Sequence, residues 1–80
     1  MTNIEKYNEV FIKAFEISED RLPGLKYHDI TAWDSVGHMG LIAEIESAFG
    51  ILLESSDIID FDSYEKGKEI LSKSIYGVEL

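Results

Sequence analysis

Apolar residues recur at steps of three and four along two long segments of the chain, and this spacing limits the fold more than any other feature. In residues 3–18 the recurring residues are Ile4, Tyr7, Val10, Phe11, Ala14, Phe15 and Ile17. In residues 35–49 they are Leu41, Ile42, Ile45, Ala48 and Phe49. Such spacing places an apolar stripe along an α-helix, and no segment shows the alternation typical of a strand. We therefore predict an all-α protein.

Capping residues mark the ends of these two helices. Thr2 or Asn3 can cap the first helix and Asp34 the second, because each side chain has an oxygen that accepts a hydrogen bond from a backbone N–H. Gly50 follows the second helix, in the position where a glycine commonly ends one. The second helix is therefore predicted over residues 35–49.

Two further helical segments are predicted after residue 50. Ser55-Ser56-Asp57 caps a short turn over residues 57–60, and Asp62 with Glu65 forms a capping box at the start of the last helix. The last helix has a thin apolar face formed by Tyr64, Ile70, Leu71 and Ile75. Gly67 either weakens its middle or permits a close helix crossing. The prediction is three main helices and one short helix.

The segment from Glu19 to Asp34 has neither helical nor strand periodicity. It contains the turn signal Leu22-Pro23-Gly24. Its large apolar residues are spread out, at Leu25, Tyr27, Ile30 and Trp33. Connections of this length are uncommon in compact domains. We therefore predict a long first loop that is pinned to the core.

Length and charge narrow the class of protein. Eighty residues suffice for a single domain over residues 1–80, and the chain has no cysteine for disulfides or thiolate metal sites. The formal net charge of −9 disfavours binding to nucleic acid or anionic lipid and favours partner proteins with basic patches. No apolar run approaches the roughly 18 residues of a membrane span, and the N-terminus lacks a basic leader region. We expect a cytoplasmic protein without a membrane span.

A second apolar row lies on the helix predicted over residues 35–49. It consists of Val36, Met39 and Ala43. A helix in so small a protein cannot bury its whole circumference, and exposed apolar residues often mark a contact site. Either this row contacts partners or it packs beneath the long loop.

The chemistry is predicted where the long loop meets the second helix, at Trp33-Asp34-Ser35-Val36. An Asp-Ser-aliphatic sequence at a helix start, followed by the apolar helix that ends in Glu44-Ile45-Glu46-Ser47-Ala48-Phe49-Gly50-Ile51, resembles the phosphopantetheine attachment region of acyl carrier proteins. The resemblance extends over most of the chain, including the helix order and the long first loop. It implies a small four-helix bundle whose Ser35 carries the prosthetic group.

Elementary chemistry agrees with this assignment of Ser35. A serine at a loop–helix junction is accessible to a modifying enzyme, and the positive end of a helix favours a phosphodiester. The chain has no thiol of its own for a thioester. The resemblance implies that 4'-phosphopantetheine from coenzyme A supplies one, attached by a phosphopantetheinyl transferase that uses Mg²⁺. Asp34 would cap the helix and help the transferase engage. The protein itself would have no catalytic residue and would not be an enzyme.

The resemblance also implies where partner enzymes dock. In this family, recognition is attributed mainly to the second helix and its acidic residues. The expected contact residues are Asp34, Val36, Met39, Glu44, Glu46 and Asp57, with Asp60 adding charge. The implied partners are the transferase, an acyl-loading ligase or transferase, and downstream enzymes of fatty acid, lipid or secondary-metabolite synthesis. We expect the carrier to be a monomer.

Four residues around Ser35 depart from the pattern of familiar fatty-acid carriers. Gly37, His38 and Gly40 stand where acidic residues also occur, and Trp33 replaces the small residue usual before the Asp. The run is more similar to stand-alone carriers of dedicated pathways. D-alanyl, aminoacyl or peptidyl carriers are alternatives in the same class. A different class is a non-covalent acidic interaction module.

His38 lies one turn after Ser35 and Asp34 is adjacent, a combination that suggests a Ser/His/Asp triad. Adjacent Asp34 and Ser35 cannot easily lie on opposite sides of one imidazole, and the chain has no Gly-rich oxyanion loop. We expect His38 to pack beside the loop rather than to act as a base. His28 and Asp29 are expected at the surface. The two histidines and scattered carboxylates lack the spacing of a metal site, and no metal is predicted.

Overall fold

The computed structural model describes all 80 residues, and the protein is all-helical, as predicted. Its helices are α1 (Asn3–Phe15), α2 (Ser35–Phe49), α3 (Ser55–Asp60) and α4 (Tyr64–Leu71), with a 3-10 turn at Glu19–Arg21. The protein has no strand, and its single β-bridge joins Lys26 to Ser63. None of its helices combines the length and the apolar character needed to cross a membrane.

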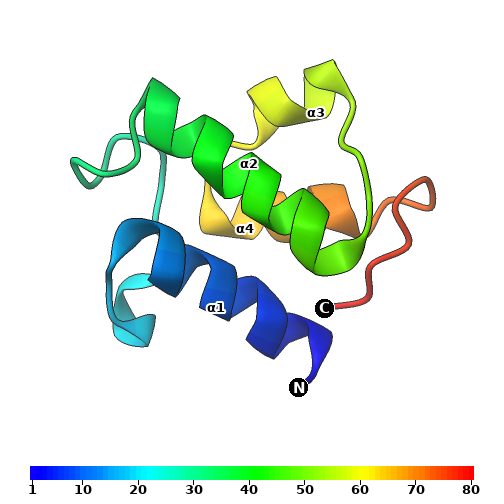
Figure 1. Ribbon diagram of the computed structural model, residues 1–80, viewed down its shortest axis with the longest axis horizontal. Coiled ribbons are helices and arrows are strands. Elements are labelled where there is room, and N and C mark those ends of the chain that lie inside the picture. The colour runs from blue at the N-terminus through cyan, green and yellow to red at the C-terminus, as the bar shows by residue number, and fades with distance from the viewer.

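The other three α-helices are arranged around α2 (Figure 1). Helices α1 and α2 lie side by side, α4 lies behind α2, and the short α3 lies near the N-terminal half of α2. The two ends of the chain are close together, and the Asn3 side-chain amide donates a hydrogen bond to the Glu79 carbonyl (3.1 Å). Helices α3 and α1 thus lie on opposite sides of α2 in this view.

Aromatic rings fill the core between these helices. Its central ring is Phe11, fully buried, which lies edge-on to Tyr7 (5.0 Å between centroids) and Trp33 (5.6 Å) and stacks on Phe61 (6.3 Å). Offset and edge-to-face aromatic pairs each add stabilisation beyond the area they bury. The core therefore joins α1 to the long loop and to the segment after α3.

The long loop is pinned to the core, as predicted. Three side chains of the loop, those of Leu22, Leu25 and Trp33, are buried in the hydrophobic core. Its backbone pairs with the start of α4, where Tyr27 donates to the Asp62 carbonyl and Tyr64 donates to the Leu25 carbonyl (both 2.8 Å). These contacts satisfy backbone groups that a buried loop would otherwise leave without partners.

Helix α1 begins as predicted but ends earlier. Thr2 caps it in a full capping box with Glu5. The helix stops at Phe15, whereas the apolar pattern predicted residue 18, because Glu16 adopts a left-handed conformation (φ 54°). Ile17 then donates to the Ile12 carbonyl, the bond of a Schellman ending. The apolar Ile17 therefore packs against the core from outside the helix.

The ends of α2 agree with the sequence prediction. The Asp34 carboxylate accepts a hydrogen bond from the Gly37 N–H (2.8 Å), and Gly50 ends the helix in the left-handed conformation (φ 64°). Leu41, Ile42 and Ile45 are buried along its core-facing stripe.

The boundaries of α3 and α4 differ from those predicted. Helix α3 begins at Ser55 rather than residue 57. The cap of α4 is Ser63, whose hydroxyl accepts from the Lys66 N–H (2.9 Å), so the predicted Asp62–Glu65 capping box is wrong. Helix α4 ends at Leu71, short of residue 75, because Val78 is buried and donates back to the Leu71 carbonyl (3.0 Å).

Gly67 permits a close helix crossing, one of the two roles considered for it. A Cβ at this position would overlap the Tyr7 hydroxyl and lie 2.7 Å from Phe61 Cε1. The Tyr7 hydroxyl donates to the Tyr64 carbonyl (2.7 Å), so α1 and α4 are joined at this crossing. Only glycine fits the space between them.

Candidate functional site

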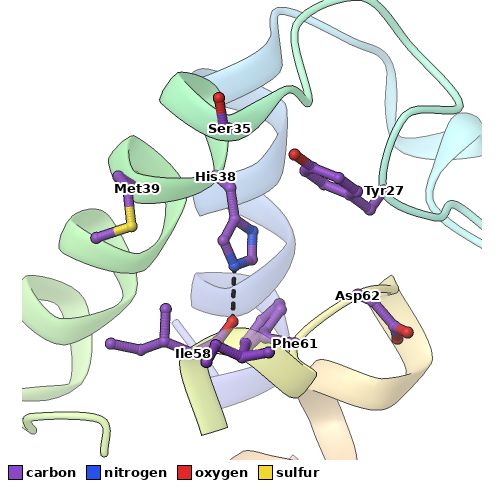
Figure 2. Close-up of a pocket in the computed structure, with 8 residues that line it drawn as sticks. Tyr27, Ser35, His38, Met39, Ile58, Phe61 and Asp62 are labelled. Atoms are coloured by element: carbon purple, nitrogen blue, oxygen red, sulfur yellow. Dashed lines mark hydrogen bonds between the residues drawn. The ribbon is translucent and has the colours of Figure 1, made fainter. Parts of the chain in front are cut away.

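Ser35 is exposed on the rim of a cleft of about 400 Å³ between α2, the long loop and α3. The loop contributes Tyr27 to its wall. Helix α2 contributes His38 and Met39, and the other side contributes Ile58, Ile59 and Phe61. Figure 2 shows Ser35 at one end of this cleft and the His38 ring extending from α2 toward the Ile58 carbonyl. Ser35 therefore lies where a group attached to its hydroxyl can reach apolar surface.

The backbone beside Ser35 offers hydrogen-bond donors. The first bond within α2 runs from the His38 N–H to the Asp34 carbonyl (2.8 Å), and the Asp34 carboxylate accepts from Gly37. The N–H groups of Ser35 and Val36 precede these bonds and have no acceptor in the protein. Because they lie at the positive end of the helix, they favour an anion next to the Ser35 hydroxyl.

His38 is held by both of its ring nitrogens. Nδ1 is 3.0 Å from Trp33 Nε1, and Nε2 is 2.8 Å from the Ile58 carbonyl oxygen. An indole N–H can only donate, so Nδ1 accepts, and the neutral ring then donates from Nε2 to Ile58. The prediction that His38 packs beside the loop is confirmed. Neither nitrogen is placed to take a proton from Ser35, so the residues do not form a triad.

Trp33 anchors the loop immediately before Asp34 and Ser35. Its side chain is fully buried, stacks on Phe15 (5.2 Å between centroids) and meets Phe11 edge-on. The departure from a small residue at this position therefore has a structural reason. The indole fills the core and its N–H fixes the His38 ring.

Apolar side chains are exposed on both sides of the cleft. Val36 is 80% exposed and Met39 55%, so this row contributes surface rather than packing under the loop. Ile59 on α3 is 78% exposed and was missed by the sequence interpretation. The adjacent pair Ile58-Ile59 was the available signal, because neighbouring residues of a helix point in directions about 100° apart, and a helix of only six residues offers a narrow buried face.

Asp57 corrects the sequence interpretation, which placed it among the partner contacts. It is only 4% exposed, its carboxylate pairs with Lys73 Nζ (2.6 Å), and it accepts a hydrogen bond from the Tyr76 hydroxyl. The bond from Lys73, followed by that from Tyr76, holds the pKa of Asp57 below its usual value. Asp57 therefore ties α3 to the C-terminal segment and is not available to a partner.

The two acidic residues expected on α2 have different surroundings. Glu44 is exposed. Glu46 is half-buried, and its carboxylate accepts a hydrogen bond from the Leu53 N–H (2.9 Å), which ties the connector after Gly50 to the helix. Asp34 is exposed, although its carboxylate is engaged as the cap. Of these three acidic residues, Glu44 is thus the one whose carboxylate forms no hydrogen bond or ion pair within the protein.

Negative charge is concentrated in one stretch of the chain. Residues 27–65, which include α2 and α3, hold nine of the sixteen Asp and Glu residues and none of the seven Lys and Arg residues. The other residues hold equal numbers of the two signs, so this stretch accounts for the whole formal charge of −9. A basic partner surface would be attracted to this stretch.

No three His, Asp or Glu side chains come together in a way that could hold a metal ion. Comparison with protein-family models, with curated proteins and with solved structures finds no match for this chain. The function is therefore inferred from the site itself.

Proposed function

We propose that this protein is an acyl carrier protein whose Ser35 bears 4'-phosphopantetheine. The observation that carries the proposal is the position of Ser35: its exposed hydroxyl lies on the rim of an apolar cleft, beside two backbone N–H groups without acceptors. The N–H groups suit the phosphate of the arm, and the cleft suits its acyl cargo. The chain has no cysteine, so the thiol of a thioester has to come from an added group.

Under this proposal, the Ser35 hydroxyl is the one group of the protein that reacts. In loading, Ser35 Oγ bonds to the phosphorus of the pantetheine phosphate of coenzyme A, the P–O bond of the pyrophosphate breaks, adenosine 3',5'-bisphosphate leaves, and the hydroxyl proton passes to the transferase. Asp34 fixes the first turn of α2 and so holds the hydroxyl outward. The arm, once bound, supplies the thiol that carries the acyl group. The protein itself catalyses no step.

The proposal includes the carrier-like four-helix bundle and the partners of such a protein. A phosphopantetheinyl transferase, an acyl-loading ligase or transferase, and downstream biosynthetic enzymes would dock with basic patches on the side that contains residues 27–65. Asp34, Val36, Met39 and Glu44 are the proposed contacts, and the exposed Ile59 joins them. Glu46 contributes negative charge while it holds the connector. The carrier is proposed to act as a cytoplasmic monomer.

Intact-mass measurement tests the modification of Ser35. After incubation with a broad-specificity transferase, Mg²⁺ and coenzyme A, we expect the wild type to gain one phosphopantetheine and Ser35→Ala to gain none. Ser55→Ala is the matched control, because Ser55 is an exposed serine at the first position of α3, as Ser35 is in α2. A wild type that gains no mass contradicts the carrier function.

The same experiment separates the alternatives. A non-covalent acidic interaction module would bind partners through Val36, Met39 and Ile59 without any gain in mass. If the arm is attached, the ligase that loads it distinguishes an acyl carrier of fatty acid, lipid or secondary-metabolite synthesis from a D-alanyl, aminoacyl or peptidyl carrier.

A further inference from the structure

We propose that His38 sets the depth of the cleft, so that the cargo sheltered beside Ser35 is a short acyl chain and a longer chain remains in solvent. The identity of the cargo rests on the proposed function. The depth of the cleft rests on the contacts of His38 and can be tested separately.

The floor of the cleft is aromatic and closed. Phe61 lines it with no exposed surface, and behind Phe61 the core is filled by Phe11 and Trp33, which are also fully buried. The His38 ring lies 6.2 Å from the Phe61 ring and 6.3 Å from that of Trp33, measured between centroids. A chain that enters from Ser35 therefore meets His38 and Phe61 before it reaches the core.

His38 spans the space between α2 and α3 at the inner end of the cleft. Its ring bridges the two helices, with Nδ1 held by Trp33 and Nε2 held by the carbonyl of Ile58 (Figure 2). That carbonyl lies in the last turn of α3, where the helix itself supplies no donor, so His38 also satisfies the end of α3. Swinging the ring aside would leave the buried indole N–H and this carbonyl unpaired, which resists entry of a chain.

Outside His38, few apolar side chains are available to a chain. A cleft of about 400 Å³ lies near the lower end of the roughly 300–1,000 Å³ usual for small-molecule sites. Its outer walls are Met39 and Ile59, both largely exposed. A short chain can lie between these side chains, and additional methylenes have no further apolar surface to bury.

The test attaches chains directly at the rim and so needs no transferase. The protein has no cysteine, so Ser35→Cys provides a single thiol for alkyl methanethiosulfonates from ethyl to dodecyl. We expect the thermal midpoint to rise over the first members of the series and then to reach a plateau. Ser55→Cys is the control, and its midpoint should not rise with chain length, because Ser55 does not line the cleft.

Two variants at His38 then test whether its ring sets the chain length at which the plateau begins. In the Ser35→Cys background, His38→Ala should shift the plateau to longer chains, because the space between α2 and α3 opens. His38→Gln should leave the plateau unchanged, since its amide can accept from Trp33 and donate to Ile58. A general loss of stability would lower every midpoint without moving the plateau, which distinguishes the two effects.

The proposal is overturned if the midpoint with His38 intact continues to rise through dodecyl, or if His38→Ala has the same plateau as its parent. Should His38→Ala fail to fold, His38→Asn takes its place, because its shorter side chain also leaves the position of the ring empty, and a plateau that does not move in that variant overturns the proposal. These results do not depend on loading of Ser35 by a transferase. The experiment therefore distinguishes failure of the proposed carrier function from failure of the proposed limit on the depth of the cleft.

Discussion

The two sides of this molecule differ in charge and in packing. Residues 27–65, with α2, α3 and the cleft, carry the whole formal charge of −9 and leave Val36, Met39 and Ile59 exposed. Helices α1 and α4 carry mixed charges, and α1 supplies Tyr7 and Phe11 to the aromatic core. The difference indicates that α1 and α4 mainly stabilise the fold, whereas α2 and α3 present a surface to other molecules.

The helical glycines differ in how closely they are packed, even within α2. Gly67 lies in α4 against Tyr7 and Phe61, and Gly37 lies against the Ala32 carbonyl, so a Cβ overlaps other atoms at both positions. Gly40 lies in the middle of α2 with no atom near the position of its Cβ. Close packing explains why glycine stands at positions 67 and 37, and it does not explain the glycine at position 40.

The largest effect is expected from Gly67→Ala. Its Cβ would overlap the Tyr7 hydroxyl and the Phe61 ring, which are held in the core and cannot move aside cheaply. Overpacking of this kind typically costs about 1–3 kcal/mol and occasionally more, and we expect the upper end because two side chains are displaced. Thermal or urea unfolding measures the loss. A variant as stable as the wild type would contradict the close crossing.

The next largest effect concerns Asp57. Asp57→Asn removes the ion pair with Lys73 that holds α3 to the C-terminal segment, so we expect a lower thermal midpoint at neutral pH. Asp60→Asn is the matched control on the same helix, because Asp60 is exposed and forms no ion pair. An equal loss in both variants would show that Asp57 acts only through net charge.

The stabilisation from Asp57 depends on pH in a defined direction. The hydrogen bond from Lys73 lowers the pKa of Asp57 in the folded state from the ordinary value of 3.8. Its contribution is therefore fully present above pH 3.8 and is lost as the pH falls through the lowered value. Stability curves of the wild type and Asp57→Asn should converge in that acidic range. Curves that stay parallel down to low pH would contradict the assignment.

The sequence predicted several local features, missed others such as the Ser63 cap of α4, and predicted long-range features poorly. The caps at Thr2 and Asp34 and the glycine ending at Gly50 were found because each depends on neighbouring residues. Asp57 was misassigned because its partners, Lys73 and Tyr76, are separated from it by the whole of α4. The early end of α4 was missed for the same reason, since it depends on Val78 folding back.

The candidate site shows the same limit. Ser35 and its position at the start of α2 followed from the sequence, and the structure agrees. The bond between Trp33 and His38 joins residues close in the chain, but their meeting with Ile58 depends on where α3 lies. No sequence pattern predicts that the His38 ring lies next to the Ile58 carbonyl. The cleft, and with it the depth available to a cargo, could be found only from the structure.

A smaller effect distinguishes the two acidic residues of α2. Glu46→Ala removes the acceptor of the Leu53 N–H, and because the carboxylate is half-buried we expect a loss of about 1 kcal/mol. Glu44→Ala should leave stability within about 0.5 kcal/mol, as is usual for an exposed residue without such contacts. Denaturant unfolding provides both values. If the two variants lose the same amount, Glu46 has no structural role.

The one effect of opposite sign is expected from Gly40→Ala. A Cβ at this position meets nothing within 4 Å, and alanine is favoured over glycine inside a helix by about 1 kcal/mol. Because Gly67 is also helical, the pair differs mainly in surroundings: alanine should stabilise α2 at residue 40 and disrupt packing at residue 67. Thermal unfolding of the two variants under one set of conditions tests this contrast. A fall in midpoint for Gly40→Ala would mean that this side of α2 is packed in solution, and would remove the distinction between the two sides of the molecule.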